Sequence, residues 1–418
     1  MEAVANSKVA AFVENWNLPS GNESLRTEAL QALKGMDFPT TRVEDWKYTR
    51  ITRITNKFYN QTAASLDVSP YIIPNLKAHI LVFVNGYFQK DLSNILEEDV
   101  VTISDINDID NDYYTDVLED VDENVFSLMN KAFATAGVHV TIPKNQKAAY
   151  PVHLLHVSTG ERTVANVRHF IQAEAGSKAE VFATFHSEGA NDAFVNIVLE
   201  GHIQENAKLT INKLQSEEQS TFHIANEIFV QDPSSNFEIN TITIGGLLVR
   251  NGLNILVEGE NCYTELNGVY LGKGKQLLDN HTFVDHLYGN CTSSETYKGV
   301  MDDQSTGVFN GKVIVRQDAQ KIQAYQSNGN VLLSDQATIN SKPELEIYAD
   351  DVRCSHGSTT GQLDEQAVFY LRARGLSEKK AKELLVSAFI GGVLEKVENE
   401  TYRAYVDELF WQKFGWQF

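Results

Sequence analysis

The chain has 418 residues, 42% of them hydrophobic, and a formal net charge of −21. Its length allows a large core in two or three domains or in one elongated domain, without disulfides. A nucleic-acid-binding protein needs a basic surface, so this charge, with no basic run, argues against nucleic acid as a partner. No stretch approaches 18 consecutive apolar residues, which argues against a membrane span.

The first 75 residues are expected to form an N-terminal helical region (1–75). Apolar residues recur at helical spacing over residues 4–16 and 24–36, and Pro39 ends the second run. A segment dense in charge and aromatic residues, Thr41–Ile51, follows.

Residues 76–136 are expected to form a hairpin and an acidic connection. Two apolar runs in His79–Ser93 surround Asn85–Gly86, the preferred dipeptide of a type I′ turn. The acidic stretch Asp91–Glu123 lacks the central glycine and terminal glutamate of an EF-hand loop, so we expect it to be solvated rather than calcium-binding. A short helix is expected over residues 124–134.

Residues 137–356 are expected to form a β-helix-like solenoid core, which makes the chain mainly β. Period-two apolar runs dominate this region, and no convincing helix interrupts them. Turn-then-strand units recur every 27–30 residues or so, a period typical of a solenoid and too short for a propeller blade. The alternative is chance alignment in a strand-rich chain. The units begin at Gly176, Asn206, Ser234, Asn261, Asn290 and Asp318.

Residues 357–418 are expected to form a C-terminal helical region. One helix spans Asp364–Arg374 and ends at Gly375, and Ser377 caps a second. The apolar stripe of the second helix either packs on the β-stack or docks a partner. An aromatic tail after it also needs cover. The expected stripe is Leu384, Leu385, Ala388, Phe389, Val393 and Leu394.

The three cysteines contain no C-x-x-C pair, and the N-terminus has no basic and apolar leader. Both observations favour a reducing, cytoplasmic location. Cys262 and Cys291 fall at nearly the same place in neighbouring repeats, which predicts small hydrophobic residues stacked inside the solenoid. Three thiolates cannot hold a four-cysteine cluster.

Cys354 and His356 are the candidate metal ligands. They are placed in a polar turn between a strand-like run and the helix at Asp364, where a soft thiolate and an imidazole can face one metal or cluster. Two donors are too few, so the remaining ligands would come from another subunit. The alternative is a turn histidine beside an incidental thiol. His281 and His286 are expected on opposite strand faces, which argues against a shared metal.

Motifs for nucleotide and hydrolase chemistry are absent. The nearest match to a Walker A loop, Gly268–Lys275, has the wrong spacing and no Ser or Thr after the lysine. No dinucleotide fingerprint, nucleophile elbow or flavin fingerprint occurs.

The segment KPELEIYADDVRCSHGSTTGQLDEQAVFYLRARG resembles the SufB/SufD family of iron–sulfur cluster assembly scaffolds, and within it the SufD branch. The resemblance extends upstream through DNHTFVDHLYGNCTSSETYKGV, TGVFNGKVIVRQDAQKIQAYQSNGNVLLS and RVEDWKYTRI. It implies a right-handed β-helix core between N-terminal and C-terminal helical regions.

The resemblance also implies partners and a role. A SufD chain pairs with SufB through the β-core, and its C-terminal helices carry the SufC ATPase, so this chain would be a non-catalytic scaffold subunit. His356, with Cys354 beside it, would offer a ligand at the SufB interface to a transient iron–sulfur cluster. A flavin in the complex and a homodimer in the absence of SufB are left open. The alternatives are a β-helix enzyme acting on polysaccharide and a structural adaptor without a metal role.

Overall fold

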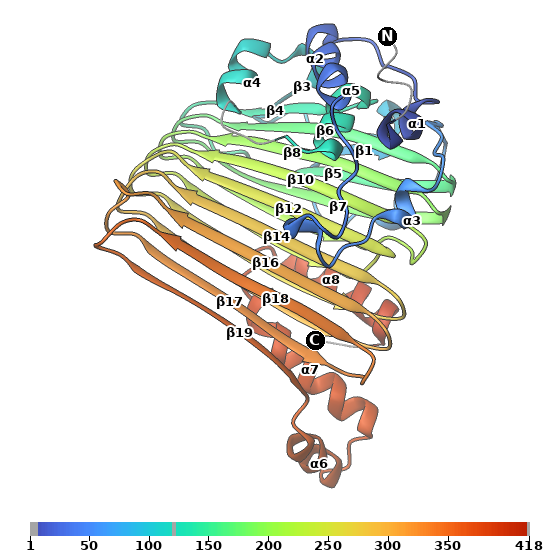
Figure 1. Cartoon of the computed structure of the whole chain (residues 1–418), viewed down its shortest axis with the longest axis vertical. Coiled ribbons are helices and arrows are strands. Elements are labelled where there is room, and N and C mark those ends of the chain that lie inside the picture. Colours follow the sequence, from blue (N-terminus) through green and yellow to red (C-terminus); the bar gives the residue numbers. More distant parts are fainter. Residues whose placement is uncertain (1–6, 119–122, 416–418) are drawn as a thin grey trace.

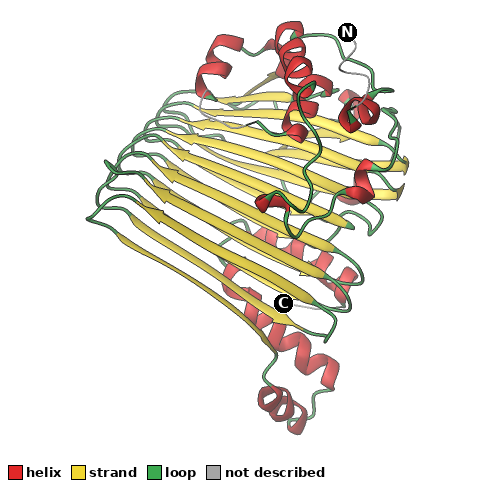
Figure 2. Cartoon of the chain, in the orientation of Figure 1, coloured by secondary structure: helices red, strands yellow, loops and turns green. Residues whose placement is uncertain are grey.

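Two facing β-sheets form the centre of the molecule in a computed structural model, which describes residues 7–118 and 123–415 (Figures 1 and 2). One sheet has ten strands and the other nine, and successive strands enter them alternately. Each strand of the main stack pairs in parallel with the strand two places earlier in sequence. This is a β-solenoid of about eight turns, which confirms the expected mainly β solenoid with helices at both ends.

The strands of each sheet follow one another in a regular order. The ten-stranded sheet consists, from one edge to the other, of β19 (Arg353–Gln362), β17 (Gln323–Leu332), β15 (Thr292–Met301), β13 (Tyr263–Gly272), β11 (Asn236–Thr243), β9 (Lys208–Gln215), β7 (Lys178–Asn191), β5 (Val152–Glu161), β1 (His79–Val84) and β2 (Tyr87–Phe88). The nine-stranded sheet consists of β18 (Thr338–Ile347), β16 (Thr306–Val315), β14 (Leu277–His286), β12 (Leu248–Val257), β10 (Phe222–Gln231), β8 (Phe194–Ile203), β6 (Val164–Ala173), β4 (Val138–Ile142) and β3 (Thr102–Asp105).

The expected repeat is visible in the turns. Five of the six predicted turn units open on a residue with φ between 59° and 69°, a left-handed bend that glycine and asparagine adopt most readily: Gly176, Asn206, Ser234, Asn261 and Asn290. The sixth unit bends at Lys321 rather than at Asp318, because a longer connection joins β16 to β17. The register pairs Asn236 with Lys208 and with Tyr263, which confirms the repeat length.

One end of the solenoid is closed. Asn85 and Gly86 both have positive φ and join β1 to β2, as expected for the hairpin. β2 and β3 pair antiparallel with their neighbours and cap the two sheets, so residues 76–136 contribute directly to the stack. The acidic stretch is not wholly solvated, because Asp99 is buried and lies 2.9 Å from His79. Its residues 119–122 lie outside the described part of the chain.

The N-terminal segments cover the outer face of the nine-stranded sheet (Figure 1). Phe12 and Phe126 pack there against Phe194. The segment around Trp46 crosses the same face, where the Arg250 guanidinium lies 3.9 Å from the ring centroid. The segments on this face are α1 (Lys8–Val13), α2 (Glu23–Leu33), α3 (Thr52–Thr55), α4 (Asn111–Val117) and α5 (Val125–Phe133), with short 3-10 turns at Glu44–Trp46 and Ile106–Asp108. Two further 3-10 turns, Ser69–Tyr71 and Lys90–Leu92, lie against the ten-stranded sheet.

The C-terminal helices α6 (Glu365–Ala373), α7 (Glu378–Leu394) and α8 (Glu400–Phe414) follow the last strand. α7 and α8 pack on the outer face of the ten-stranded sheet, so the stripe of α7 covers the β-stack rather than awaiting a partner. The expected stripe was partly wrong. Val386 and Ile390 are buried while Leu384 is 48% exposed, because the helix turns a neighbouring face to the sheet. The aromatic tail is itself helix α8, begun by an Asn399 cap, except for residues 416–418, which lie outside the described chain.

Candidate functional site: the open end of the solenoid

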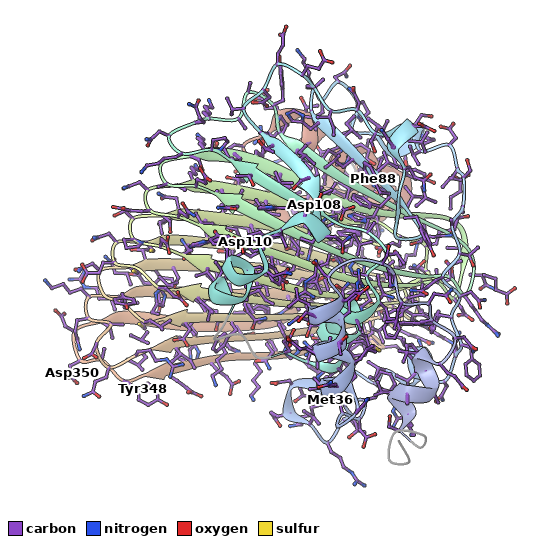
Figure 3. All side chains as sticks on the ribbon, turned by 90° about the horizontal axis from the view of Figure 1, so that it is seen from above. Met36, Phe88, Asp108, Asp110, Tyr348 and Asp350 are labelled. Atoms are coloured by element: carbon purple, nitrogen blue, oxygen red, sulfur yellow. The ribbon has the colours of Figure 1, made fainter. Side chains whose placement is uncertain are left out.

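The second end of the solenoid is open. β18 and β19 are the last strands of their sheets, and the described chain adds no further strand beyond them. Most residues of β19 are exposed, whereas the strands of the central turns are largely buried. Figure 3 shows Tyr348 and Asp350, in the turn between β18 and β19, at the margin of the molecule. An exposed strand edge presents unpaired backbone groups that another chain can pair with.

Cys354 and His356 lie on β19, not in the expected polar turn. The strand continues to Gln362, so the boundary expected at residue 356 falls inside it. Because the two residues are two positions apart on one strand, their side chains point to the same face. The register pairs Cys354 with the buried Ala324 and His356 with the buried Gln326, so this face is the inner face of the solenoid.

The two side chains differ in exposure. Cys354 is partly buried and packs against the core, and burial raises the pKa of its thiol. Its sulfur is therefore a thiol at neutral pH, which is a weaker metal ligand than a thiolate. His356 is exposed at the open end. An exposed imidazole is the more available donor of the two.

A polar pair, Glu295 and Gln326, lies beneath His356 inside the solenoid. Gln326 Nε2 donates to Glu295 Oε2 at 2.7 Å, and Thr282 Oγ1 donates to the other carboxylate oxygen at 2.5 Å. Burial raises the pKa of Glu295 to about 7, against the effect of these two hydrogen bonds. Neither residue was singled out from the sequence. The signal for them was a charged residue and an amide residue at positions that period-two counting places on the inner face of their strands.

A second polar network occupies the same end. Tyr270 donates to Asn330 Oδ1 at 2.6 Å, and Asn330 Nδ2 donates to Asn328 Oδ1 at 2.6 Å. Ser341 also donates to Asn328 Oδ1, and Ser358 on β19 donates to Ser341, each at 2.7 Å. The interior of the last turns is therefore hydrogen-bonded up to the open end. Polar side chains also lie inside the turns around β11, where Lys213 Nζ donates to Glu227 Oε2 at 2.6 Å and Gln215 Nε2 donates to Asn251 Oδ1 at 2.9 Å.

The other candidate residues are structural. Cys262 and Cys291 are both buried in the core, and the Cys262 N–H donates to Cys291 Sγ at 3.4 Å, so the predicted stacking is confirmed. His286 is buried and lies 2.9 Å from Ser293 Oγ, while His281 lies on the other face, 3.0 Å from Asp279. Their separation on opposite faces is also as expected.

The site on β19 is incomplete within this chain. Within residues 7–118 and 123–415, no three His, Cys, Asp or Glu side chains are grouped so as to hold a metal ion. None of the described helices combines the length and apolar character needed to cross a bilayer. The inner face of β19 thus offers two donors at an edge that is open to another chain.

Comparison with known proteins gives two domain matches and several relatives. The SufBD core domain of the SUF system for FeS cluster assembly matches residues 156–389, and the SufBD protein N-terminal region matches residues 11–154. The chain is 30% identical to the iron–sulfur cluster assembly protein SufD of Escherichia coli, over 90% of this chain and 89% of the relative. It is 31% identical to an iron–sulfur cluster assembly SufBD family protein of Synechocystis, over 89% and 86%. For SufD of Bacillus subtilis the identity is 24%, over 95% of each chain.

Proposed function

The chain belongs to the SufBD family of iron–sulfur cluster assembly proteins, and we propose that it is a SufD-type scaffold subunit that pairs with SufB and carries the SufC ATPase. Its part in iron–sulfur cluster assembly is that of a scaffold component, and the nascent cluster is its cargo. The observation that supports this role most strongly is the exposure of His356 on the last strand of its sheet, whose outer edge is unpaired in the described chain.

The pairing surface is the open edge formed by β18 and β19. The Arg353 N–H donates to the Ile322 carbonyl at 2.8 Å, toward β17. Along a strand, successive N–H groups point to opposite sides, so those of Cys354, His356 and Thr360 point to the free edge. A SufB strand that pairs with this edge would bring its own side chains close to His356. The ligands that this chain lacks would then come from SufB.

Proline at Thr360 is expected to prevent this pairing without unfolding the solenoid. The substitution removes an N–H that faces the free edge, where proline is tolerated, and leaves the hydrogen bonds to β17 intact. The Thr360→Val variant keeps the N–H and the shape of the side chain and serves as the control. Copurification with SufB should fall by roughly tenfold or more for the proline variant and stay unchanged for the valine variant. Equal pairing by the two variants would place the interface elsewhere.

The docking element for SufC is the C-terminal helical region. α7 and α8 pack against the ten-stranded sheet, whereas α6 has no buried residue and projects past the last strand (Figure 1). α6 therefore offers a preformed, capped helix to the ATPase. The cytoplasmic location and a homodimer in the absence of SufB stay predictions.

A further inference from the structure

The carbonyl oxygen of the Gln326 side chain is buried and faces no donor. Among the described residues, none donates a hydrogen bond to Gln326 Oε1. Above pH 7, where Glu295 is mostly ionised, its carboxylate can only accept, so Gln326 turns Nε2 toward it and the orientation of the amide is fixed from below. Oε1 is left as the free end of the amide. Buried polar atoms without a partner are rare and point to a missing contact.

The position of the amide is built into the fold. A Cβ at residue 311 would lie 2.2 Å from Gln326 Nε2, so a larger residue there would push the amide out of its present position. On the facing sheet, the register aligns Thr282, Gly311 and Pro343 in one column. On the ten-stranded sheet it aligns Glu295, Gln326 and His356. Thr282 contacts Glu295 directly, and the space opposite Gln326 is kept free by the glycine.

His356 is the next side chain in this column. Paired residues of neighbouring parallel strands lie about 4.8 Å apart, and both side chains point to the inner face. A rotation of the exposed imidazole is therefore expected to bring one of its ring N–H groups toward Gln326 Oε1. The imidazole has no other described side chain above it, because β19 is the last strand of its sheet.

We propose that Glu295 and Gln326 are positioning residues for His356: Gln326 Oε1 accepts one ring N–H of the imidazole, and Glu295 fixes the orientation of the amide. This inference rests on the proposed role of His356 as a ligand. Histidines that bind metal donate their second ring N–H to a carboxylate or carbonyl, which fixes the tautomer and the ring orientation. Here that acceptor would be an amide backed by a carboxylate, and the other ring nitrogen would be presented outward to the cargo.

The column changes character toward the open end. Deeper in the solenoid its positions are filled by the buried apolar side chains of Leu266 and Ile239. The polar residues begin at Glu295 and end at His356. The titratable neighbours Tyr270 and Tyr297 are kept neutral, because burial raises the pKa of both.

The test is the tautomer of His356, read by NMR of the full chain with isotope-labelled histidine at pH 8, where Glu295 is ionised. His356→Ala assigns the signal. We expect a single tautomer in the wild type and a mixture in Gln326→Leu and in Glu295→Gln. In Glu295→Gln the new amide can both donate and accept, so it no longer fixes which end of the Gln326 amide faces it. Gln323→Leu is the matched control, because this glutamine lies on the outer face of the same strand. Thermal unfolding of each variant establishes that it is folded.

The outcomes separate this inference from the proposed function. An unchanged tautomer in both folded variants overturns the positioning role, even if His356→Ala still lowers cluster loading. A shifted tautomer together with normal loading in His356→Ala supports the hydrogen bond and contradicts the ligand role. If Gln326 positions His356 and His356 is also a ligand, iron loading of the complex with SufB should fall in Gln326→Leu. The expected cause is a loss of about 10–100-fold in metal affinity.

Discussion

Alanine at His356 is expected to lower the iron and sulfide content of the anaerobically purified complex with SufB and SufC by roughly tenfold or more, while the complex still assembles. His356 is exposed on an edge strand, so its removal opens no cavity, and the one buried atom it would otherwise satisfy, Gln326 Oε1, already has no described donor. The change therefore acts on the ligand set and not on the fold. Iron and acid-labile sulfide per complex are the quantities to measure.

Two variants on the same inner face serve as references for this result. Thr360→Val keeps β19 intact and should load as the wild type does. Cys354→Ser should have a smaller effect than His356→Ala, because burial keeps the Cys354 sulfur in its thiol form. Normal loading of the His356→Ala complex would make the chain a structural adaptor with no metal role.

Aspartate at both Phe369 and Tyr370 is expected to abolish binding of SufC. The two side chains are 72% and 56% exposed on α6, a helix with no buried residue. Large aromatic side chains on a protruding helix are typical interface anchors, each contributing about 2 kcal/mol or more. Copurification with SufC and stimulated ATP hydrolysis measure the effect, and circular dichroism shows whether the helix is retained.

Trp411→Asp is the matched control for the α6 variant, since Trp411 is 49% exposed but lies on α8. It should leave SufC binding unchanged. Loss of binding in Trp411→Asp with retention in the α6 variant would place the docking element on α8.

Repetition in the sequence predicted the solenoid, because the same bend recurs at residues such as Asn206, Asn261 and Asn290, whose conformation favours asparagine. The strand β19 was less predictable. Its residues Gly357–Gly361 have a turn-like composition with low strand propensity, yet pairing with β17 keeps them extended. Pairing of β19 with β17 therefore outweighs the low strand propensity of these residues at the candidate site.

The buried pair Glu295 and Gln326 beneath His356 was not predicted from the sequence, although its period-two pattern was present. Period-two counting from Tyr297 or Ala324 places Glu295 and Gln326 on the inner face. What the sequence could not supply is that the two strands are neighbours in exact register. The sequence pattern of helix α8 was also present, because Asn399 is a favourable cap and the buried Tyr402, Val406 and Phe410 recur at helical spacing.

We expect the cluster site to be shared between two chains at the open end of the solenoid. Its most direct test is anaerobic reconstitution of this chain alone and of its complex with SufB, followed by iron and sulfide analysis and visible absorbance. We predict a cluster on the complex and no stable cluster on the lone chain, because no three potential ligands are grouped among its described residues. A stoichiometric iron–sulfur cluster on the lone chain would contradict the claim.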